Sequence, residues 1–496
     1  MSQDEKSVGH QVAKGAVWMV AARLAVKGIG IVSIMILARV LTPDDFGVIA
    51  LASSIYAMIE LMRSMGFDTV LIQNQNAGRE HYDTAWTLQI IFSTIAALAM
   101  VIISQPLANY YGDERLAPVL WVMGCMTFLN GLANIGVVEF RKKMTFNKEF
   151  IFQVLVKLSG FIVTIPLALY WKSYWAMLMG MLVTRVVTLW LSYHMQSYRP
   201  KLSLSVYKEI LGFSAWLFLN NVLKFMGLHG QNFITAKLAG SGGLGVLSIS
   251  TEIGMLVSNE LVAPINRAAY PGYAKVAGNV KELKSLYLKI LSHVALVSSF
   301  GGFVIASTAS VFVPVLLGDK WMESIELLQI ISISGVLVGL NSNAGYIYIV
   351  LGKPSLSTAL ISLRVIMLLP LIYFLSLKYQ ILGVAIAQLV VSLIMFPLSQ
   401  LLINRQLQVK TKEMLNVLYR PIISGIVTFL VFEWQNVTAV FEGISIYPVA
   451  ILVFKMTSVV VFYIGTLLFL VLLSKEDCCA EKEIFESMKV KLYRSE

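Results

Sequence analysis

The sequence predicts an all-α membrane protein with about fourteen transmembrane helices. Of its 496 residues, 57% are hydrophobic and only 14% are charged, whereas soluble globular domains contain roughly 45–50% apolar residues. The apolar residues occur in runs of about 20, the length that a helix needs to cross the hydrocarbon core of a bilayer. Short loops separate these runs, which lack the ~10-residue alternation of a transmembrane barrel. These observations favour a bundle of membrane-spanning helices.

The expected spans follow one another with little chain between them. Pro and Gly interrupt several runs, as membrane helices tolerate. The fourteen spans cover residues 16–38, 46–66, 84–105, 116–138, 149–170, 173–195, 209–230, 243–264, 288–312, 323–350, 355–376, 381–404, 416–434 and 447–474.

The distribution of Lys and Arg predicts the orientation of the bundle. With the amino terminus in the cytoplasm, 25 of the 39 cations lie on the cytoplasmic side or at the cytoplasmic ends of spans, 6 lie on the outer side and 8 lie deeper within spans. This asymmetry is the one that the positive-inside rule requires, so both termini are expected in the cytoplasm. The net charge of +11 then reflects cations that face anionic lipid headgroups, and nucleic acid is not an expected partner.

The first two spans carry charges that would be costly in lipid. Arg23 and Lys27 stand four residues apart in the first span and therefore share one face of the helix. A central cation costs roughly 2.5–3.5 kcal/mol on insertion scales, so both are expected to line a watery cavity. In the second span, Glu60 and Arg63 can pair across one helical turn, and a purely structural ion pair is the alternative to a role in transport.

The seventh and eighth spans carry a comparable set of polar residues. Lys224 lies in a polar part of the seventh span and is expected to face a cavity. Glu252 lies in the eighth span, as Glu60 lies in the second. A membrane carboxylate can be a counter-ion to a cation or the site of a coupling H⁺ or Na⁺, and both readings stay open for these two acids.

Later spans contain further cations. Arg364 lies about ten residues into the eleventh span, too deep for snorkelling, and a cavity role is expected. Lys157 and Arg185 can reach the headgroups through their long stems, and Lys455 is expected to be an interfacial anchor. Because cations outnumber acids, the cavity should favour anions, and Arg and Lys suit phosphate oxygens.

The chain also contains an internal repeat. A shift of 198 residues superimposes the first two spans on the seventh and eighth without a gap. Because an even number of spans separates the two copies, they have the same orientation and form a parallel repeat. Such a repeat predicts an alternating-access carrier with a site between two lobes. The shift pairs Trp18 with Trp216, Arg39 with Lys237 and Gly47 with Gly245. The predicted divisions are an N-lobe of six spans (1–198), a C-lobe of six spans (199–405), two additional spans (406–474) and a cytoplasmic tail (475–496).

Five segments carry a resemblance to a known family. They are ILARVLTPDDFG (36–47), GFDTVLIQNQ (66–75), FNKEF (146–150), YPGYAKV (270–276) and FVPVLLGDKW (312–321). Over roughly residues 10–405 the sequence resembles bacterial polysaccharide exporters of the Wzx/PST type. These belong to the multidrug/oligosaccharidyl-lipid/polysaccharide (MOP) superfamily, and the resemblance is to its colanic-acid-exporter-like branch.

The resemblance implies a flippase of the bacterial cytoplasmic (inner) membrane. Such a protein moves an undecaprenyl-diphosphate-linked oligosaccharide, a precursor of lipopolysaccharide or exopolysaccharide, to the outer leaflet. The family's cavity cations have counterparts at Arg23 and Arg63, and polysaccharide polymerase machinery is a compatible partner. No cofactor is implied apart from a coupling H⁺ or Na⁺ gradient.

Two alternatives remain at this point. A drug or metabolite exporter of the same superfamily would share the lobes but would need a cavity that attracts cations. A membrane glycan polymerase or ligase would need a sizeable outer loop, whereas the longest expected here, near 106–115, has about ten residues. The sequence also lacks a metal cluster, a nucleotide-binding glycine loop and a nucleophile elbow, so an enzyme is not expected.

Overall fold

The computed structural model of the chain confirms the all-α prediction. It describes residues 3–63, 71–72, 74, 76–143, 145–434 and 448–473, and these contain helices and no strand. Side chains are described within these ranges except at 3–17, 20, 62–63, 209–221, 224 and 434. The chain divides into two compact units, Met1–Gly245 and Val246–Glu496. The units are defined by packing and the lobes by the repeat, so the predicted lobe boundaries remain a prediction.

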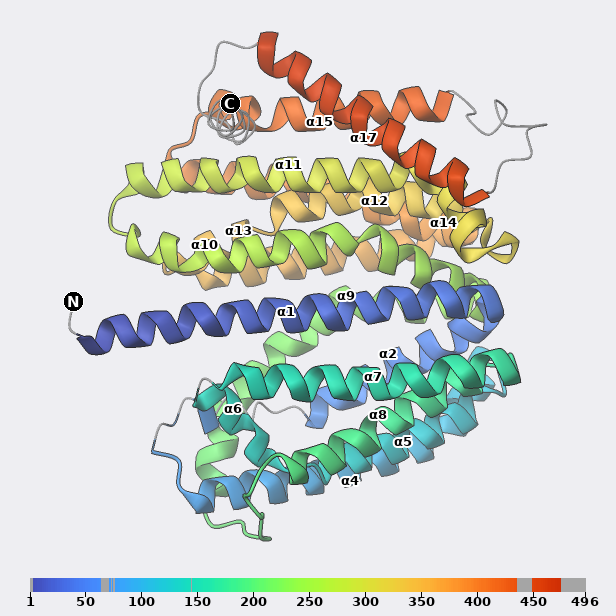
Figure 1. Cartoon of the computed structure of the whole chain (residues 1–496), viewed down its shortest axis with the longest axis vertical. Helices are drawn as coiled ribbons and strands as arrows, with labels where there is room; N and C mark the ends of the chain where they lie inside the picture. Colours follow the sequence, from blue (N-terminus) through green and yellow to red (C-terminus); the bar gives the residue numbers. More distant parts are fainter. Residues whose placement is uncertain are drawn as a thin grey trace, which may run out of the picture. The chain divides into compact units, whose positions relative to one another are not determined.

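Each predicted span overlaps one or more helices in the described part of the chain. The helices up to the unit boundary are α1 (Gln3–Val40), α2 (Pro43–Arg63), α4 (Arg79–Tyr111), α5 (Leu116–Gly131), the 3-10 turn η1 (Ile135–Val138), α6 (Glu139–Lys142), α7 (Phe146–Trp171), α8 (Trp175–His194) and α9 (Tyr207–Gly254), the last of which crosses that boundary. Later come η2 (Val257–Val262), α10 (Ala263–Lys275), α11 (Val280–Phe312), η3 (Val313–Leu317), η4 (Asp319–Trp321), α12 (Ser324–Asn341), α13 (Ala344–Val350), α14 (Pro354–Leu407), α15 (Thr411–Trp434) and α17 (Pro448–Leu473) (Figure 1).

Two of the long helices extend over more than one predicted span: α9 contains 209–230 and the first part of 243–264, and α14 contains 355–376 and 381–404. α9 breaks at Gly240 (φ 69°, ψ −175°), and α14 breaks at Gln380 (φ 48°, ψ −128°). Among the described residues, ten helical segments are long and apolar enough to cross a membrane, or eleven when α5 and the segment Ile135–Lys142, bent by 70°, count as one span. The protein is therefore a multi-pass membrane protein.

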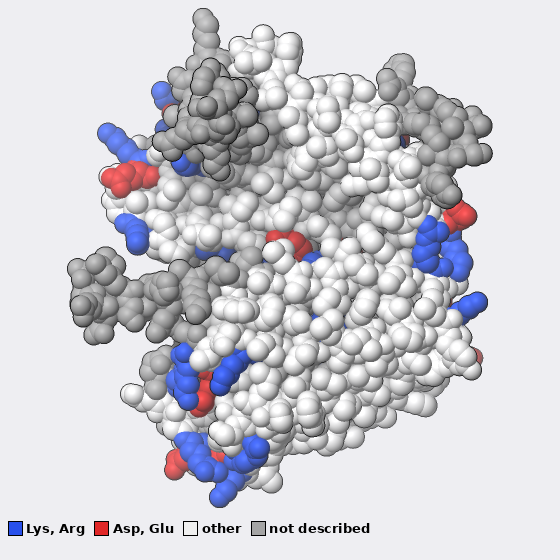
Figure 2. Space-filling view, viewed as in Figure 1, with Lys and Arg blue, Asp and Glu red and all other residues white. Residues whose placement is uncertain are grey.

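The surface has the polarity that a bilayer requires. Lys and Arg on the visible face gather near the ends of the helices, and the surface between them is almost free of charge (Figure 2). Large apolar side chains such as Ile102, Ile162 and Val461 are more than 60% exposed. A soluble domain would seldom leave so many large apolar side chains in water, whereas lipid solvates them.

In the first unit, the helices pack in neighbouring pairs. α1 runs along α7, where the Trp18 ring meets Phe150 edge to face at 5.1 Å. α4 pairs with α5, and α7 pairs with α8. The segment after α8 lies against α4, since Asp83 accepts hydrogen bonds from the Tyr198 hydroxyl and from the Lys201 backbone N–H at 2.9 Å. The segment at the predicted lobe boundary, 198–201, is therefore docked on α4.

The segment LTPDDFG forms the turn between α1 and α2. Thr42 and Asp45 make a capping box: the Thr42 backbone N–H donates to the Asp45 carboxylate at 3.0 Å, and the Asp45 backbone N–H donates to the Thr42 hydroxyl oxygen at 3.3 Å. Pro43 begins α2, where its missing N–H costs nothing. The segment is thus an efficient helix start, which explains its residue types.

A symmetrical contact between α2 and α9 supports the internal repeat. A Cβ added to Gly47 would lie 1.7 Å from the carbonyl oxygen of Ser241, and a Cβ added to Gly245 would lie 1.9 Å from that of Pro43. Pro43 and Ser241 are separated by the same 198 residues as the two glycines. The repeat therefore places equivalent residues against each other, and only glycine permits this backbone approach.

We predict that Gly47→Ala destabilises the protein by about 1–3 kcal/mol, because the added methyl group must push two backbones apart. The measurement is the Tm of the purified protein in detergent. Gly28→Ala is the matched control, since nothing lies within 4 Å of a Cβ at Gly28. Equal melting temperatures for the two variants would contradict the close approach.

A charged clasp holds the loop between α4 and α5. Arg115 donates to both carboxylate oxygens of Asp113, at 2.9 and 2.8 Å, and the Ser241 hydroxyl donates to Asp113 at 2.6 Å. Burial raises the pKa of the Asp113 carboxyl, but these hydrogen bonds and the charge of Arg115 outweigh it, and the pKa lies below its ordinary value. The ionised carboxylate is therefore the form that the fold stabilises.

This depressed pKa predicts a pH dependence. The clasp stabilises the folded state above the ordinary pKa of aspartate, 3.8, and this contribution is lost as the pH falls through the lower folded value. Asp113→Asn should cost about 1–2 kcal/mol near neutral pH and progressively less in acid, measured as Tm against pH. Glu114→Gln, at an exposed neighbour, is the control, and a deficit that stays constant down to the acid limit would contradict the clasp.

In the second unit, α11 packs against α12, α15 and α17. Its core contains buried tyrosines whose hydroxyls are satisfied inside the protein. The Asn343 amide donates to the Tyr273 hydroxyl at 2.8 Å, the Tyr287 hydroxyl donates to Gln400 at 2.6 Å, and the Tyr348 hydroxyl donates to the Ser399 carbonyl at 3.2 Å. These bonds tie α10 to the start of α13, α11 to α14, and α13 to α14, so the unit has a polar centre within an apolar bundle.

Candidate anion pocket

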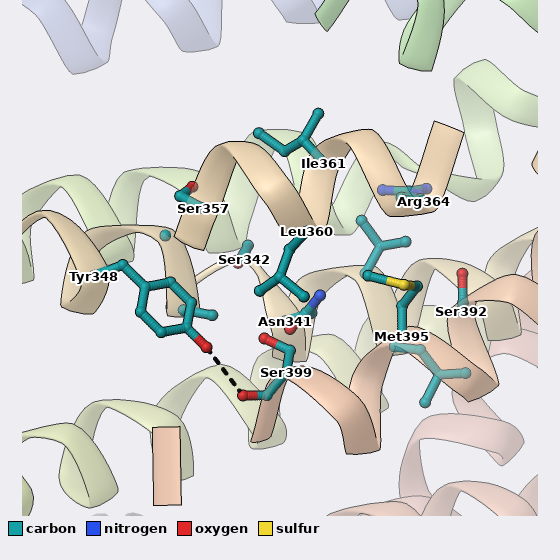
Figure 3. A pocket seen from close by; sticks show the side chains of 14 residues that line it. Asn341, Ser342, Tyr348, Ser357, Leu360, Ile361, Arg364, Ser392, Met395 and Ser399 are labelled. Carbon is teal, nitrogen blue, oxygen red and sulfur yellow. Dashed lines mark hydrogen bonds between the residues drawn. The ribbon is translucent and has the colours of Figure 1, made fainter. Parts of the chain in front are cut away.

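A pocket of about 310 Å³ lies inside the second unit. Its walls come from α12, α13 and both halves of α14, so residues far apart in the sequence meet there. The polar and charged side chains that line it include Asn341, Tyr348, Ser357, Arg364 and Ser399 (Figure 3). Tyr348 and Ser357 lie toward one end of the pocket, and Arg364 lies toward the other.

Arg364 supplies the charge of the pocket. It stands ten residues beyond Pro354, the first residue of α14, which at 1.5 Å per residue places it about 15 Å along the helix. Within the described part of the chain, its side chain has no hydrogen bond or ion pair, although it is only partly exposed. A guanidinium at this depth is costly unless water or an anionic ligand reaches it.

Two polar atoms of the pocket wall have no hydrogen-bond partner among the described residues. The Asn341 Oδ1 and the Ser399 Oγ are buried and make no hydrogen bond to any described residue. Buried polar atoms normally have a partner, and an exception needs an explanation. In Figure 3 these two side chains lie next to each other below Leu360. The pocket thus combines one cation with polar groups that can still form hydrogen bonds.

The structure places the other predicted cations only in part. Arg23 and Lys27 lie on α1, half-buried, in the first unit. Arg63 is the last residue of α2, and Lys224 lies within α9, but both side chains fall outside the described residues. A common cavity for Arg23, Lys27, Arg63, Lys224 and Arg364 therefore stays a prediction.

The two predicted acids lie in different surroundings. Glu60 is partly buried on α2, one turn beyond Tyr56, whose ring lies 5.9 Å from the Arg185 guanidinium. Glu252 is exposed near the end of α9. The sequence predicts that Arg185 reaches the headgroups. The structure adds a contact of Arg185 with Tyr56, which links α8 to α2 and which the sequence did not predict.

The expectation for Lys455 is wrong. Its side chain is 2% exposed, and its ammonium group donates to the Ser310 hydroxyl at 2.8 Å. Because α17 packs against α11, the lysine points into that helix contact instead of reaching the membrane interface. Its place near a helix end suggested snorkelling, and only the packing of α17 shows otherwise.

Sequence reasoning also missed the uncharged residues of the pocket. Asn341, Ser342 and Asn343 form a polar run inside the tenth predicted span, and this run was the available signal. Ser357 and Ser399 gave no signal, since single serines are common in membrane helices. Their role as pocket walls depends on how three helices pack.

The segments that carry the family resemblance are structural where they are described. In FNKEF, Glu149 is buried and pairs with Arg141 at 2.6 Å. In YPGYAKV, the buried Tyr273 accepts the bond from Asn343. In FVPVLLGDKW, Gly318 takes φ 102° and the ring of Trp321 is fully buried. These residues fix helix ends, and none of them lines the pocket.

Solved structures support this architecture. The lipid II flippase MurJ in an inward closed conformation has a TM-score of 0.66 and 13% identity, covering 92% of this chain and 98% of that chain. A multidrug resistance transporter of the MATE family, in an inward-facing conformation, has a TM-score of 0.60 and 16% identity, covering 79% of this chain and 99% of that chain. At these identities the likeness shows the fold alone.

Sequence comparison gives the family. The lipopolysaccharide biosynthesis protein WzxC of Escherichia coli (strain K12) is 23% identical over 398 residues, covering 79% of this chain and 80% of that protein. The succinoglycan biosynthesis transport protein ExoT of Rhizobium meliloti (strain 1021) is 21% identical over 333 residues, covering 66% and 67%. Residues 36–326 match the family described as Polysaccharide biosynthesis protein. Since this match covers more than half of the chain, the protein belongs to that family, as the five segments predicted.

Proposed function

We propose that this protein is a flippase that moves an undecaprenyl-diphosphate-linked oligosaccharide across the bacterial cytoplasmic membrane by alternating access. The observation that carries the proposal is Arg364, a cation deep in a membrane-spanning helix that faces a polar pocket without a protein partner among the described residues. The family, and the names of WzxC, ExoT and MurJ, support a lipid-linked glycan as the substrate.

The chemistry of the substrate explains why cations are needed. A diphosphate cannot cross a low-dielectric slab unless charge compensates it, and Arg forks and Lys point charges suit phosphate oxygens. In this proposal Arg23, Lys27, Arg63, Lys224 and Arg364 bind the diphosphate along its route. The prenyl tail needs no polar site and stays in lipid.

The membrane potential can contribute to the direction of transport. With the inside negative, outward movement of a negative headgroup gains about 2.3 kcal/mol per charge per 100 mV. The gain is smaller if protein cations move with the headgroup. Coupling to H⁺ or Na⁺ through Glu60 or Glu252 would add a second source of energy, and polysaccharide polymerase machinery would receive the product. No reaction is catalysed in this proposal, and the substrate leaves chemically unchanged.

We predict that Arg23→Ala and Arg364→Ala each reduce export of the lipid-linked glycan by about 10–100-fold, because each removes a charge-assisted bond of about 1.5–3 kcal/mol to the diphosphate. The assay is flipping of the substrate in proteoliposomes at matched protein amounts. Arg405→Ala, at an exposed arginine near the end of α14, is the control.

Wild-type flipping by both variants would remove the diphosphate role of these arginines. If the wild-type protein binds organic cations and ignores prenyl-diphosphate sugars, the drug-exporter alternative replaces the proposal. Chemical conversion of the lipid-linked glycan by the purified protein would instead support a polymerase or ligase.

The acids give a separate prediction. If coupling runs through them, Glu60→Gln or Glu252→Gln should abolish the dependence of flipping on an imposed H⁺ or Na⁺ gradient, because the amide cannot release a proton or bind the ion as a carboxylate does. Flipping is measured with and without each gradient, and Glu326→Gln, at an exposed residue of α12, is the control. An unchanged gradient dependence in both variants would leave these acids structural.

A further inference from the structure

We propose that the pocket of the second unit is a saccharide subsite that takes one sugar ring with an adjacent oxyanion. The inference rests on the proposed function and narrows it, since it assigns part of the glycan to a defined place. The oxyanion is either a carboxylate carried by the ring or the phosphoryl group that links the ring to the lipid. Both present two oxygens to a guanidinium.

The pocket carries one positive charge. Arg364 is the single ionisable lysine, arginine, aspartate or glutamate among the described residues that line it. One uncompensated positive charge matches a ligand group with one negative charge. A neutral ligand would leave the guanidinium without a partner, and an organic cation would be repelled.

The pocket walls combine apolar and polar side chains. Leu337, Leu360, Ile361 and Met395 supply an apolar surface, and the polar groups lie at separate points of the same pocket. A sugar ring has this dual character, since its C–H faces are apolar and its hydroxyl groups point outward from its edge. An acyl chain would leave the polar groups unsatisfied, and a bare phosphate would leave the apolar wall without contact.

Two buried polar atoms of the pocket have no hydrogen-bond partner among the described residues. Ser399 is fully buried, and its hydroxyl oxygen makes no hydrogen bond to a described residue. The same holds for Asn341 Oδ1, which can only accept a hydrogen bond and therefore suits a ligand hydroxyl. Sugar hydroxyls both donate and accept, so they can satisfy both atoms.

The volume of the pocket and the exposure of its walls also favour a single sugar ring. A volume of about 310 Å³ is at the lower end of the 300–1,000 Å³ typical of small-molecule pockets, which suits one ring better than an extended oligosaccharide. Ser357, Leu360, Ile361 and Arg364 on the first half of α14 are partly exposed, whereas Ser392 and Ser399 on its second half are buried. The pocket thus has an accessible side and a closed floor.

The test uses the full-length protein purified in detergent, with saturation-transfer NMR of four probes: glucuronate, glucose 1-phosphate, glucose and inorganic phosphate. We expect at least one of the two charged sugars to bind with a Kd in the millimolar range, because a fragment gains little over the cost of association. Glucose alone and phosphate alone should each bind at least about tenfold more weakly, since each lacks one of the two sets of contacts.

Variants separate the pocket from other anion sites. Arg364→Gln should remove binding of the charged sugar, Arg364→Lys should retain part of it, and Arg405→Gln should leave it unchanged. Ser357→Leu, which fills the polar end and keeps the arginine, should also remove it, so the test does not depend on one variant's folding. The charged sugar that binds identifies the source of the oxyanion.

Three results would overturn the inference. They are binding that Arg364→Gln and Ser357→Leu leave unchanged, inorganic phosphate binding as tightly as both charged sugars, and no charged sugar binding to the wild-type protein. In each case, flipping of the lipid-linked glycan by the wild-type protein would show that the proposed function stands without this subsite. Absence of flipping as well would remove both.

Discussion

Placing a cation inside a membrane is costly, and this cost is the main constraint on the second unit of the protein. Charged residues of this chain gather at the helix ends, where they meet water, and apolar residues cover the helix surfaces that meet lipid. An arginine deep in a span fits neither environment. The second unit accommodates Arg364 by placing a pocket beside it, with polar side chains from three helices around its rim. A fold that only needed to be stable would gain by replacing the arginine with leucine. In the proposed function, the charge of Arg364 serves to bind an anionic ligand.

The structural parts of the chain have different determinants. The α1–α2 turn is a capped helix start, and its contact with α9 relies on two glycines that the repeat relates to each other. The ion pair of Arg141 with the buried Glu149 and the hydroxyl groups of buried tyrosines hold the ends and centres of the helices. The segments typical of the family serve this framework, whereas the pocket is lined by other residues. Family membership thus follows from the framework, and in our proposal substrate choice depends on the pocket.

The sequence could predict whatever depends on position along one helix. The spans, the depth of Arg364 and the pairing of Gly47 with Gly245 all follow from spacing. It could not predict what depends on contacts between helices: Asn341 and Ser399 meet because α12 packs against α14, and Lys455 is buried because α17 packs against α11. The positions of Arg63 and Lys224 relative to the pocket depend on such contacts as well. Besides the depth of Arg364, a polar run inside a span such as 341–343 is a signal that indicates the uncharged residues of the pocket.

The central claim is that membrane-embedded cations of this protein bind the phosphorylated headgroup of a polyprenyl lipid. Native mass spectrometry of the purified protein, offered equal amounts of undecaprenyl diphosphate and uncharged undecaprenol, tests this most directly. We expect the protein to retain the diphosphate preferentially, and we expect this preference to fall sharply when Arg23 and Arg364 are both changed to glutamine. Equal retention of the two lipids, or a preference that survives the double substitution, would contradict it.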